Sequence, residues 1–272
     1  MHEAEHQLKI DMERLAILLL VYLVGFELFL VIIDILITYE RWIDYRPIRM
    51  LCNIAREDGI ASWFMTAQTL MSALVLWFLY WLSRRLDGIS AFHQRGWLVL
   101  ALFFSFMAID DGAMIHERLG ATFELVMRKS HQIGDVSLLG QMFAVFPSYG
   151  WQFIVLPFFI LMGFFTLYFL WDVLGRGRPL ILVFIALSCF AFAVGLDFIE
   201  GMRRDHPYNM YTWIKDTYVL GNYEVDHFAK SLEEFLEMLG ISLFFSIFVA
   251  HVNQVAKSPV ICFGRLSHSE KI

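Results

Sequence analysis

Residues 15–37 read LAILLLVYLVGFELFLVIIDILI, an apolar run in which Glu27 and Asp34 are the only charged residues. A transmembrane helix needs about 20 mostly apolar residues, so this run predicts a helix that crosses a bilayer. The residues before it, through Arg14, are charged and polar, and the run carries no small-residue cleavage signature. We therefore expect a retained helix rather than a removed signal peptide.

Five further runs of the same kind follow along the chain. Together with the first run, they predict an all-α fold, a polytopic membrane helix bundle of about six transmembrane helices. We expect a single integral membrane domain over residues 1–272, since no soluble segment is large enough to fold alone. The predicted spans are 15–37, 61–83, 97–115, 149–174, 180–202 and 228–253.

The composition points to the same class of protein. Of the 272 residues, 58% are hydrophobic and 18% are charged, whereas soluble domains carry roughly 45–50% apolar and about 25% charged residues. The net charge of −6 and the lack of a basic tract argue against a nucleic-acid partner. The three cysteines have no paired spacing, which argues against a CxxC motif or a disulfide framework.

The connections between the predicted helices alternate in length and charge. Those at 84–95 and 175–179 are short and net basic, so the positive-inside rule places them in the cytoplasm together with both termini. The other connections are longer and acid-rich, and we expect them outside, at roughly 38–60, 116–148 and 203–226. Residues 42–56 are predicted to lie along the interface as a short helix or re-entrant piece.

Acidic residues gather at one end of five predicted helices. An ionisable group at the centre of a membrane helix costs at least about 2.5–3.5 kcal/mol, so it is retained only where something offsets that cost. The acids come late in the helices that run outward and early in those that run inward, which places them in the outer half of the bilayer. They are Asp34, Glu57, Asp58, Asp110, Asp111, Glu117, Asp197, Glu200, Asp226, Glu233, Glu234 and Glu237.

Helical spacing predicts which of these side chains share a face. Residues three, four or seven apart lie on one side of a helix. Small residues flank the acids, and they allow membrane helices to approach closely. The spaced sets are Asp110 with Glu117, Asp197 with Glu200, His227 with Glu234 and Glu237, and an alternative stripe of Asp226, Glu233 and Glu237; the flanking glycines are Gly112, Gly120, Gly195, Gly201 and Gly240.

So many carboxylates in a low-dielectric site must be neutralised by protons, bases or a metal cation. The nearby bases Lys230, Arg118 and Arg203 are too few. Carboxylates with histidine suit a divalent ion such as zinc, iron, manganese or calcium. Two ions are an option by analogy with carboxylate-bridged di-metal bundles, although the Glu-x-x-His pairs of those bundles are missing. The predicted ligands are Asp110, Glu117, Asp197, Glu200, His227, Glu234 and Glu237, and the candidate catalytic residues are His116 and Asp111.

Part of this pattern also has a purely structural interpretation. Glu117 and Arg118 fit a solvated amphipathic extension of the third helix, and Asp226 and Lys230 fit an exposed helix start. The deeper acids Asp110, Asp197 and Glu237 are the hardest to explain in this way.

A local motif resembles one found in uncharacterised bacterial multi-pass membrane proteins. Residues 106–117 read FMAIDDGAMIHE, similar to a Ser-x-Asp-Glu-x-x-x-x-His-Glu pattern, with Asp111 where the pattern has Glu. Residues 53–64 and the Glu-rich last helix are similar too. The resemblance implies a bacterial inner membrane and carries no function.

Three functions remain open at this point. The first is a metal-dependent enzyme whose pocket opens to the outer leaflet or periplasm and takes an amphipathic, lipid-like or periplasmic substrate. The second is a proton or divalent-cation transporter or channel, although His251 and Asp172 are almost the only ionisable groups in the inner half. The third is a non-catalytic subunit of a membrane complex, and oligomerisation is compatible with all three.

Overall fold

The computed structural model describes residues 6–9, 11–134, 137–256 and 260–263. Within these ranges, six helices are long and apolar enough to cross a membrane, which confirms the all-α, polytopic bundle. The protein is therefore an integral multi-pass membrane protein. The spanning helices are α1 (Met12–Ile33) continued by the π-helix η1 (Asp34–Tyr39), α3 (Ile60–Arg85), α4 (Ala91–Ala113), α8 (Leu156–Leu174), α9 (Arg178–Gly201) and α11 (Asn222–Ala256).

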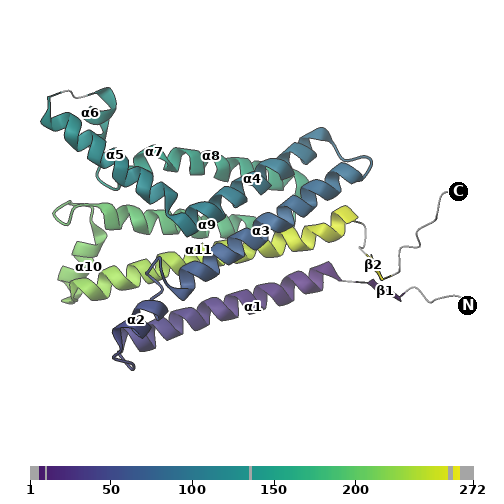
Figure 1. Cartoon of the computed structure of the whole chain (residues 1–272), viewed down its shortest axis with the longest axis horizontal. Coiled ribbons are helices and arrows are strands. Elements are labelled where there is room, and N and C mark those ends of the chain that lie inside the picture. The colour runs from purple at the N-terminus through teal and green to yellow at the C-terminus, as the bar shows by residue number, and fades with distance from the viewer. Residues whose placement is uncertain (1–5, 10, 135–136, 257–259, 264–272) are drawn as a thin grey trace, which may run out of the picture.

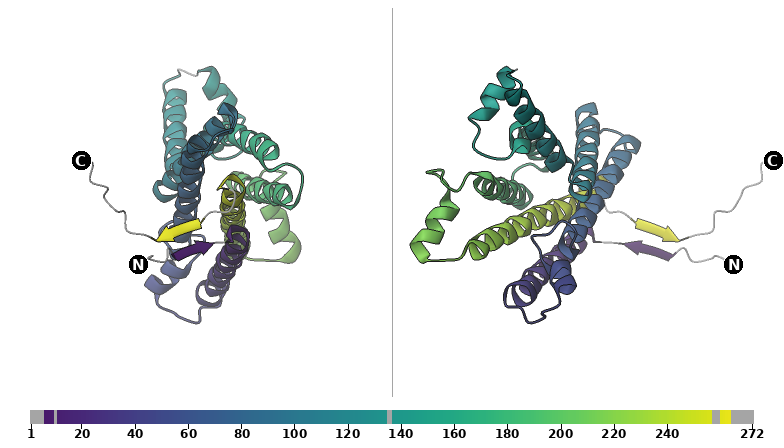
Figure 2. Two further views of the ribbon diagram at one scale, coloured as in Figure 1. Left: turned by 90° about the vertical axis from the view of Figure 1, so that its right-hand side faces the viewer. Right: turned by 60° about the vertical axis from the view of Figure 1, so that its left-hand side comes forward.

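The shorter elements divide between the two ends of the bundle. At one end lie α2 (Arg46–Cys52), α5 (Ile115–Gln132), α6 (Leu138–Ala144), α7 (Gly150–Ile154) and α10 (Met210–Tyr218) (Figure 1). At the other end, β1 (His6–Lys9) pairs antiparallel with β2 (Val260–Phe263), beside both termini (Figure 2). The short α3–α4 connection lies at this terminal end as well, as the alternation of the loops predicted.

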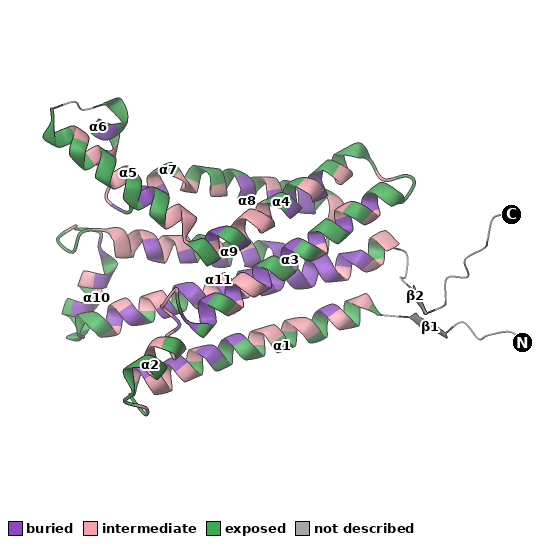
Figure 3. Cartoon of the chain, in the orientation of Figure 1, coloured by how far each residue is buried: buried purple, intermediate pink, exposed green. Residues whose placement is uncertain are grey.

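Helix α11 is the centre of the bundle. It packs against α1, α3 and α9. In its most apolar stretch of 18 residues, 72% of the residues are buried, whereas the corresponding share in the first spanning helix is 17%. Figure 3 shows buried positions along most of its length. An apolar core that includes Trp97, Phe169 and Phe248 fills the half of the bundle nearer the termini. The acid-bearing helix ends lie in the opposite half.

The third predicted span does not continue straight past the membrane surface. Helix α4 ends at Ala113, Met114 takes a left-handed conformation (φ 51°, ψ 46°), and α5 starts in a new direction (Figure 1). The amphipathic extension is therefore a separate helix. The last helix, in contrast, does extend without a break beyond its predicted bounds at both ends.

The fourth predicted span is also divided. Its first residues form α7, Val155 interrupts the helix, and α8 follows with proline at one of its first positions. Pro157 has no N–H to donate to the preceding turn, and its ring disfavours a helix that continues through it.

Three of the flanking glycines leave no room for a side chain, and a Cβ on Gly201 would lie 2.3 Å from Ser148 Oγ. A Cβ on Gly120 of α5 would lie 2.4 Å from the backbone nitrogen of Trp151, and one on Gly240 of α11 would lie 2.8 Å from the Phe190 ring. Gly195 has nothing within 4 Å of such a Cβ, so its expected role in close packing does not hold.

Candidate functional site

A cavity of about 200 Å³ brings most of the predicted site residues together. It lies among α3, α4, α5, α8, α9 and α11. Seven of the nine candidates line it: Asp110, Asp111, His116, Glu117, Asp197, Glu234 and Glu237. Glu57, Lys230 and Glu233 line it too, although they were not among the predicted ligands or catalytic residues.

The cavity is acidic at one end and apolar at the other. Going towards the termini along α4, Asp110 and Asp111 give way to Met107 and Phe104 in its wall. On α9, Asp197 is followed by Val194, Phe190 and Leu187, and on α11, Glu234 and Glu237 are followed by Ile241 and Phe244. The lining of the cavity is therefore amphipathic, with carboxylates at one end and apolar side chains at the other.

The acidic end has a large excess of carboxylates over bases. Lys230 Nζ lies 2.7 Å from Glu233 Oε1 and 3.6 Å from Glu234 Oε1. Lys230 and His116 are the bases in the described lining, against the acids Glu57, Asp110, Asp111, Glu117, Asp197, Glu233, Glu234 and Glu237. Like charges so close together among buried side chains repel one another strongly unless something neutralises them.

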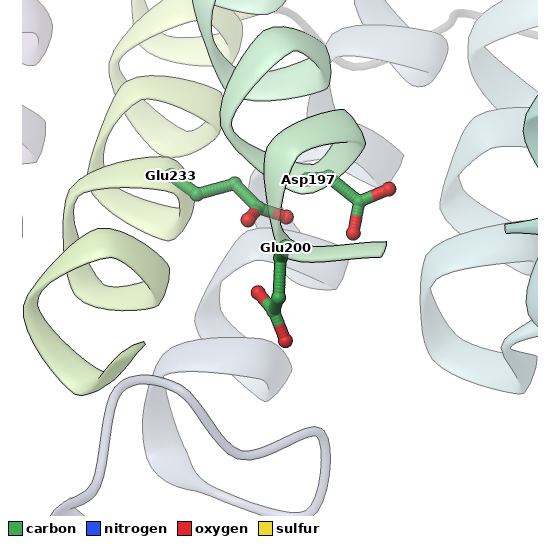
Figure 4. A group of neighbouring side chains, drawn as sticks. All are labelled: Asp197, Glu200 and Glu233. Atoms are coloured by element: carbon green, nitrogen blue, oxygen red, sulfur yellow. The ribbon is translucent and has the colours of Figure 1, made fainter. Parts of the chain in front are cut away.

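Three of the carboxylates form a group that could hold an ion. One oxygen each from Asp197, Glu200 and Glu233 lie within 4.8 Å of one another. Figure 4 shows Asp197 and Glu200 near the end of α9, with Glu233 reaching towards them from α11. Glu233 is 4% exposed. Its Oε2, like Oε2 of Glu200, is buried and has no hydrogen-bond partner among the described residues.

Asp197 is held in place by neighbours from α7. Its Oδ2 accepts hydrogen bonds from Gln152 Nε2 at 2.6 Å and from Trp151 Nε1 at 3.1 Å. The break at Val155 sets the direction of α7 and thereby brings these two donors to the site.

His116 is oriented by Asp110 across the turn at Met114. The backbone N–H of His116 donates to Asp110 Oδ1, and its Nδ1 lies 2.8 Å from Asp110 Oδ2. An ionised carboxylate only accepts, so Nδ1 is the donor, and in the neutral imidazole Nε2 is left as the acceptor. Burial lowers the pKa of His116, but the hydrogen bond and charge of Asp110 together with the charges of Glu117 and Asp197 outweigh burial, so that this pKa lies above its ordinary value.

Asp111 and Glu57 complete the wall near α3. Thr66 Oγ1 donates a hydrogen bond to Asp111 Oδ2. Burial, together with the negative charge of Glu117, raises the pKa of Glu57 above its ordinary value. Glu57 comes from the segment just before α3, so five separate parts of the chain supply acids to one cavity.

The structure places His227 and Glu200 outside the cavity lining. His227 Nε2 lies 2.9 Å from Asp34 Oδ2, which also accepts from Ser231 Oγ at 3.0 Å. One side of the first turns of α11 faces η1, so His227 contacts Asp34 of the first spanning helix, whereas Lys230 and Glu233 line the cavity. Glu200 instead belongs to the group with Asp197 and Glu233.

These features define a class: a multi-pass membrane protein with an acidic, partly apolar cavity between its helices. The chain belongs to the family described as a domain of unknown function, DUF8692, which matches residues 14–252. The match includes every residue of the cavity lining. No curated protein matches the chain. No solved structure matches it either.

Proposed function

We propose that the protein is a metal-dependent membrane enzyme that acts on an amphipathic substrate. The observation that carries this proposal is the Glu233 carboxylate, buried beside Asp197 and Glu200 with one oxygen that no donor of the described residues reaches. A buried acceptor without a partner is unfavourable by about 1–3 kcal/mol, and more when it is charged. A divalent cation bound by these oxygens would remove that penalty and the repulsion among the acids.

The ligand set fits hard or borderline ions. Carboxylate oxygens suit manganese, calcium and iron, and zinc also takes carboxylate with histidine. Glu234 and Glu237 line the same cavity and leave room for a second ion. Such an ion would activate a water molecule or polarise a substrate oxygen.

Residues beside the proposed metal supply the other parts of a reaction. His116, oriented by Asp110, has Nε2 free to accept a proton and suits a general base or proton shuttle. Lys230 would hold its carboxylate neighbours in place and offset part of their charge.

The cavity walls indicate the kind of substrate. Deep rings such as Phe104, Phe190 and Phe244 suit an acyl chain or another apolar group. The polar part of the same molecule would then lie at the acids. By the positive-inside rule the acidic end faces outward, so the substrate would enter from the outer leaflet or periplasm of a bacterial inner membrane.

Packing at the deep end favours an enzyme over a transporter. The Trp97 and Phe169 ring centroids are 4.9 Å apart, and those of Phe104 and Phe248 are 5.3 Å apart. These rings fill the space between the cavity and the terminal end of the bundle. A transport path would have to continue through this packed core.

The test is lipid turnover by the full chain in nanodiscs made from bacterial total lipid extract. Lipid composition is compared by mass spectrometry before and after incubation with manganese, zinc or iron, and with EDTA. We expect wild type with metal to consume at least one lipid species. Wild type with EDTA should consume none, and neither should the variants Glu233→Gln and His116→Ala. Asp87→Asn, at the opposite end of the bundle, is the matched control and should behave as wild type. Unchanged lipids under every metal condition would overturn the assignment of a lipid-like substrate.

A further inference from the structure

A second pocket, of about 240 Å³, lies at the acidic end of the bundle but is basic. It is an open pocket, lined by the end of η1 and the turn after it, by α2 and the loop that follows it, and by the start of α11. Four arginines line it together with Asn53 and Tyr223, and there is no acid among its described lining residues. The arginines are Arg41, Arg46, Arg49 and Arg56.

The positive charge of this pocket is only partly balanced. Arg56 is paired with Asp58 through two hydrogen bonds of 2.7 and 2.9 Å. Arg49 is 3.9 Å from Asp44, a side chain that is 87% exposed. In the part of the chain that the structure describes, Arg41 and Arg46 have no acidic partner, so the pocket keeps a net positive charge.

One donor in the pocket also lacks an acceptor. Arg49 Nε is buried and has no hydrogen-bond partner among the described residues. Arg41 has a left-handed backbone (φ 55°), which is uncommon for a residue other than glycine. A fork of guanidinium donors around a small polar space is the arrangement that recognises a phosphate group.

The surroundings of the pocket suit a lipid headgroup. Trp42 and Tyr45 precede α2 and are 73% and 72% exposed, and Leu51 on α2 is also exposed. Exposed aromatic rings at the end of membrane helices lie at headgroup level. A short segment with apolar side chains outside and arginines on the pocket would lie on the bilayer surface.

We propose that this pocket binds the phosphate of an anionic phospholipid in the outer leaflet. The arginines would contact the phosphate oxygens, while Trp42 and Tyr45 would lie among the neighbouring headgroups. The inference is independent of the metal site, because no residue lines both pockets.

The experiment measures binding of short-chain phosphatidylglycerol, phosphatidylcholine and inorganic phosphate to the full, detergent-purified chain by native mass spectrometry. Arg41→Gln/Arg46→Gln removes two pocket arginines. Arg84→Gln/Arg85→Gln removes two arginines from the end of α3, at the opposite end of the bundle, and is the matched control. A thermal melt of each variant checks that it is folded.

We expect wild type to bind phosphatidylglycerol at least about tenfold more tightly than phosphatidylcholine. Both lipids offer the same phosphate oxygens, but the cationic choline group of phosphatidylcholine would be repelled by the pocket arginines. The pocket variant should lose at least about tenfold in affinity for phosphatidylglycerol, and the control variant should lose none. Equal losses in both variants, or no loss in a folded pocket variant, would overturn the proposal. If inorganic phosphate bound as tightly as phosphatidylglycerol, the ligand would be free phosphate and the assignment of a lipid would be overturned.

Discussion

Glu27 on α1 and Glu233 on α11 are both almost completely buried, at 0% and 4% exposure, but their surroundings differ. Glu27 Oε1 accepts hydrogen bonds from two neutral donors, Gln68 Nε2 at 2.8 Å and Ser242 Oγ at 2.6 Å. Glu233 lies beside the carboxylates of Asp197 and Glu200 and accepts a hydrogen bond from Lys230. In both glutamates Oε2 is buried without a hydrogen-bond partner among the described residues. Burial of an acid is therefore common to both places, and the charge of its neighbours distinguishes them.

The contrast separates a structural role from a chemical one. The hydrogen bonds of Glu27 join α1 to α3 and α11, and buried polar groups with partners of this kind stabilise helix packing. Asp34, with His227 and Ser231, is a second example on the same helix. The acids of the cavity instead repel one another, an arrangement that persists in proteins when it serves a site.

Metal removal should change the thermal stability most, and it tests the difference between Glu27 and Glu233 directly. A ligand that binds only the folded state at 100 times its dissociation constant adds about 2.7 kcal/mol of stability. We expect EDTA to lower the melting temperature of metal-loaded wild type and of Glu27→Gln. Differential scanning fluorimetry in detergent should detect no such shift for Glu233→Gln. A shift of equal size in Glu233→Gln would place the metal elsewhere.

Truncation of the two glutamates should affect the stability of metal-free protein to different extents. Glu27→Ala leaves the side chains of Gln68 and Ser242 without their shared acceptor, so we expect a loss of about 1–3 kcal/mol. Glu233→Ala removes the 2.7 Å partner of Lys230 but also one of several repelling charges, and Glu234 remains 3.6 Å from Lys230, so we expect a smaller loss than for Glu27→Ala. Thermal melts in EDTA measure both variants. If Glu233→Ala destabilised the metal-free protein as much as Glu27→Ala, the two regions would not differ in kind.

Asp110 is an intermediate case and should give the smallest effect. It lines the cavity, but its oxygens already accept from the backbone and ring of His116, much as a capping residue does at a helix start. Asp110→Ala should lower stability by about 0.5–2 kcal/mol, the range for loss of a helix cap. Asp110→Asn keeps an acceptor for the His116 N–H and should lose less. Equal melting temperatures for the two variants would argue against the capping role.

The sequence predicted the spanning helices well because each is a long apolar run. The first was expected over 15–37 and is found over Met12–Tyr39, and the second was expected over 61–83 and is found over Ile60–Arg85. The breaks at Met114 and Val155 were not predicted. A left-handed methionine has no sequence signal, whereas Pro157 was a signal that could have divided the fourth span.

The site was predicted in part, and the reason is geometric. Alternating helix directions place acids at one level, so Asp110 and Asp197 could be expected to meet. The spacing of residues along a helix predicts which side chains share a face, but it does not predict which neighbouring helix that face contacts. His227 therefore faces Asp34, and Glu233, assigned only to an alternative stripe, contributes to the site because α11 is surrounded on several sides.

The measurement that tests the central claim most directly is the metal content of purified protein by inductively coupled plasma mass spectrometry. Wild type, Glu233→Gln and Glu27→Gln are grown in the same metal-replete medium and purified without chelator. The comparison of the two glutamates predicts a near-stoichiometric divalent metal in wild type and Glu27→Gln, and its loss in Glu233→Gln. Wild type without bound metal, or metal retained in Glu233→Gln, would contradict the assignment of the acidic cavity as a metal site.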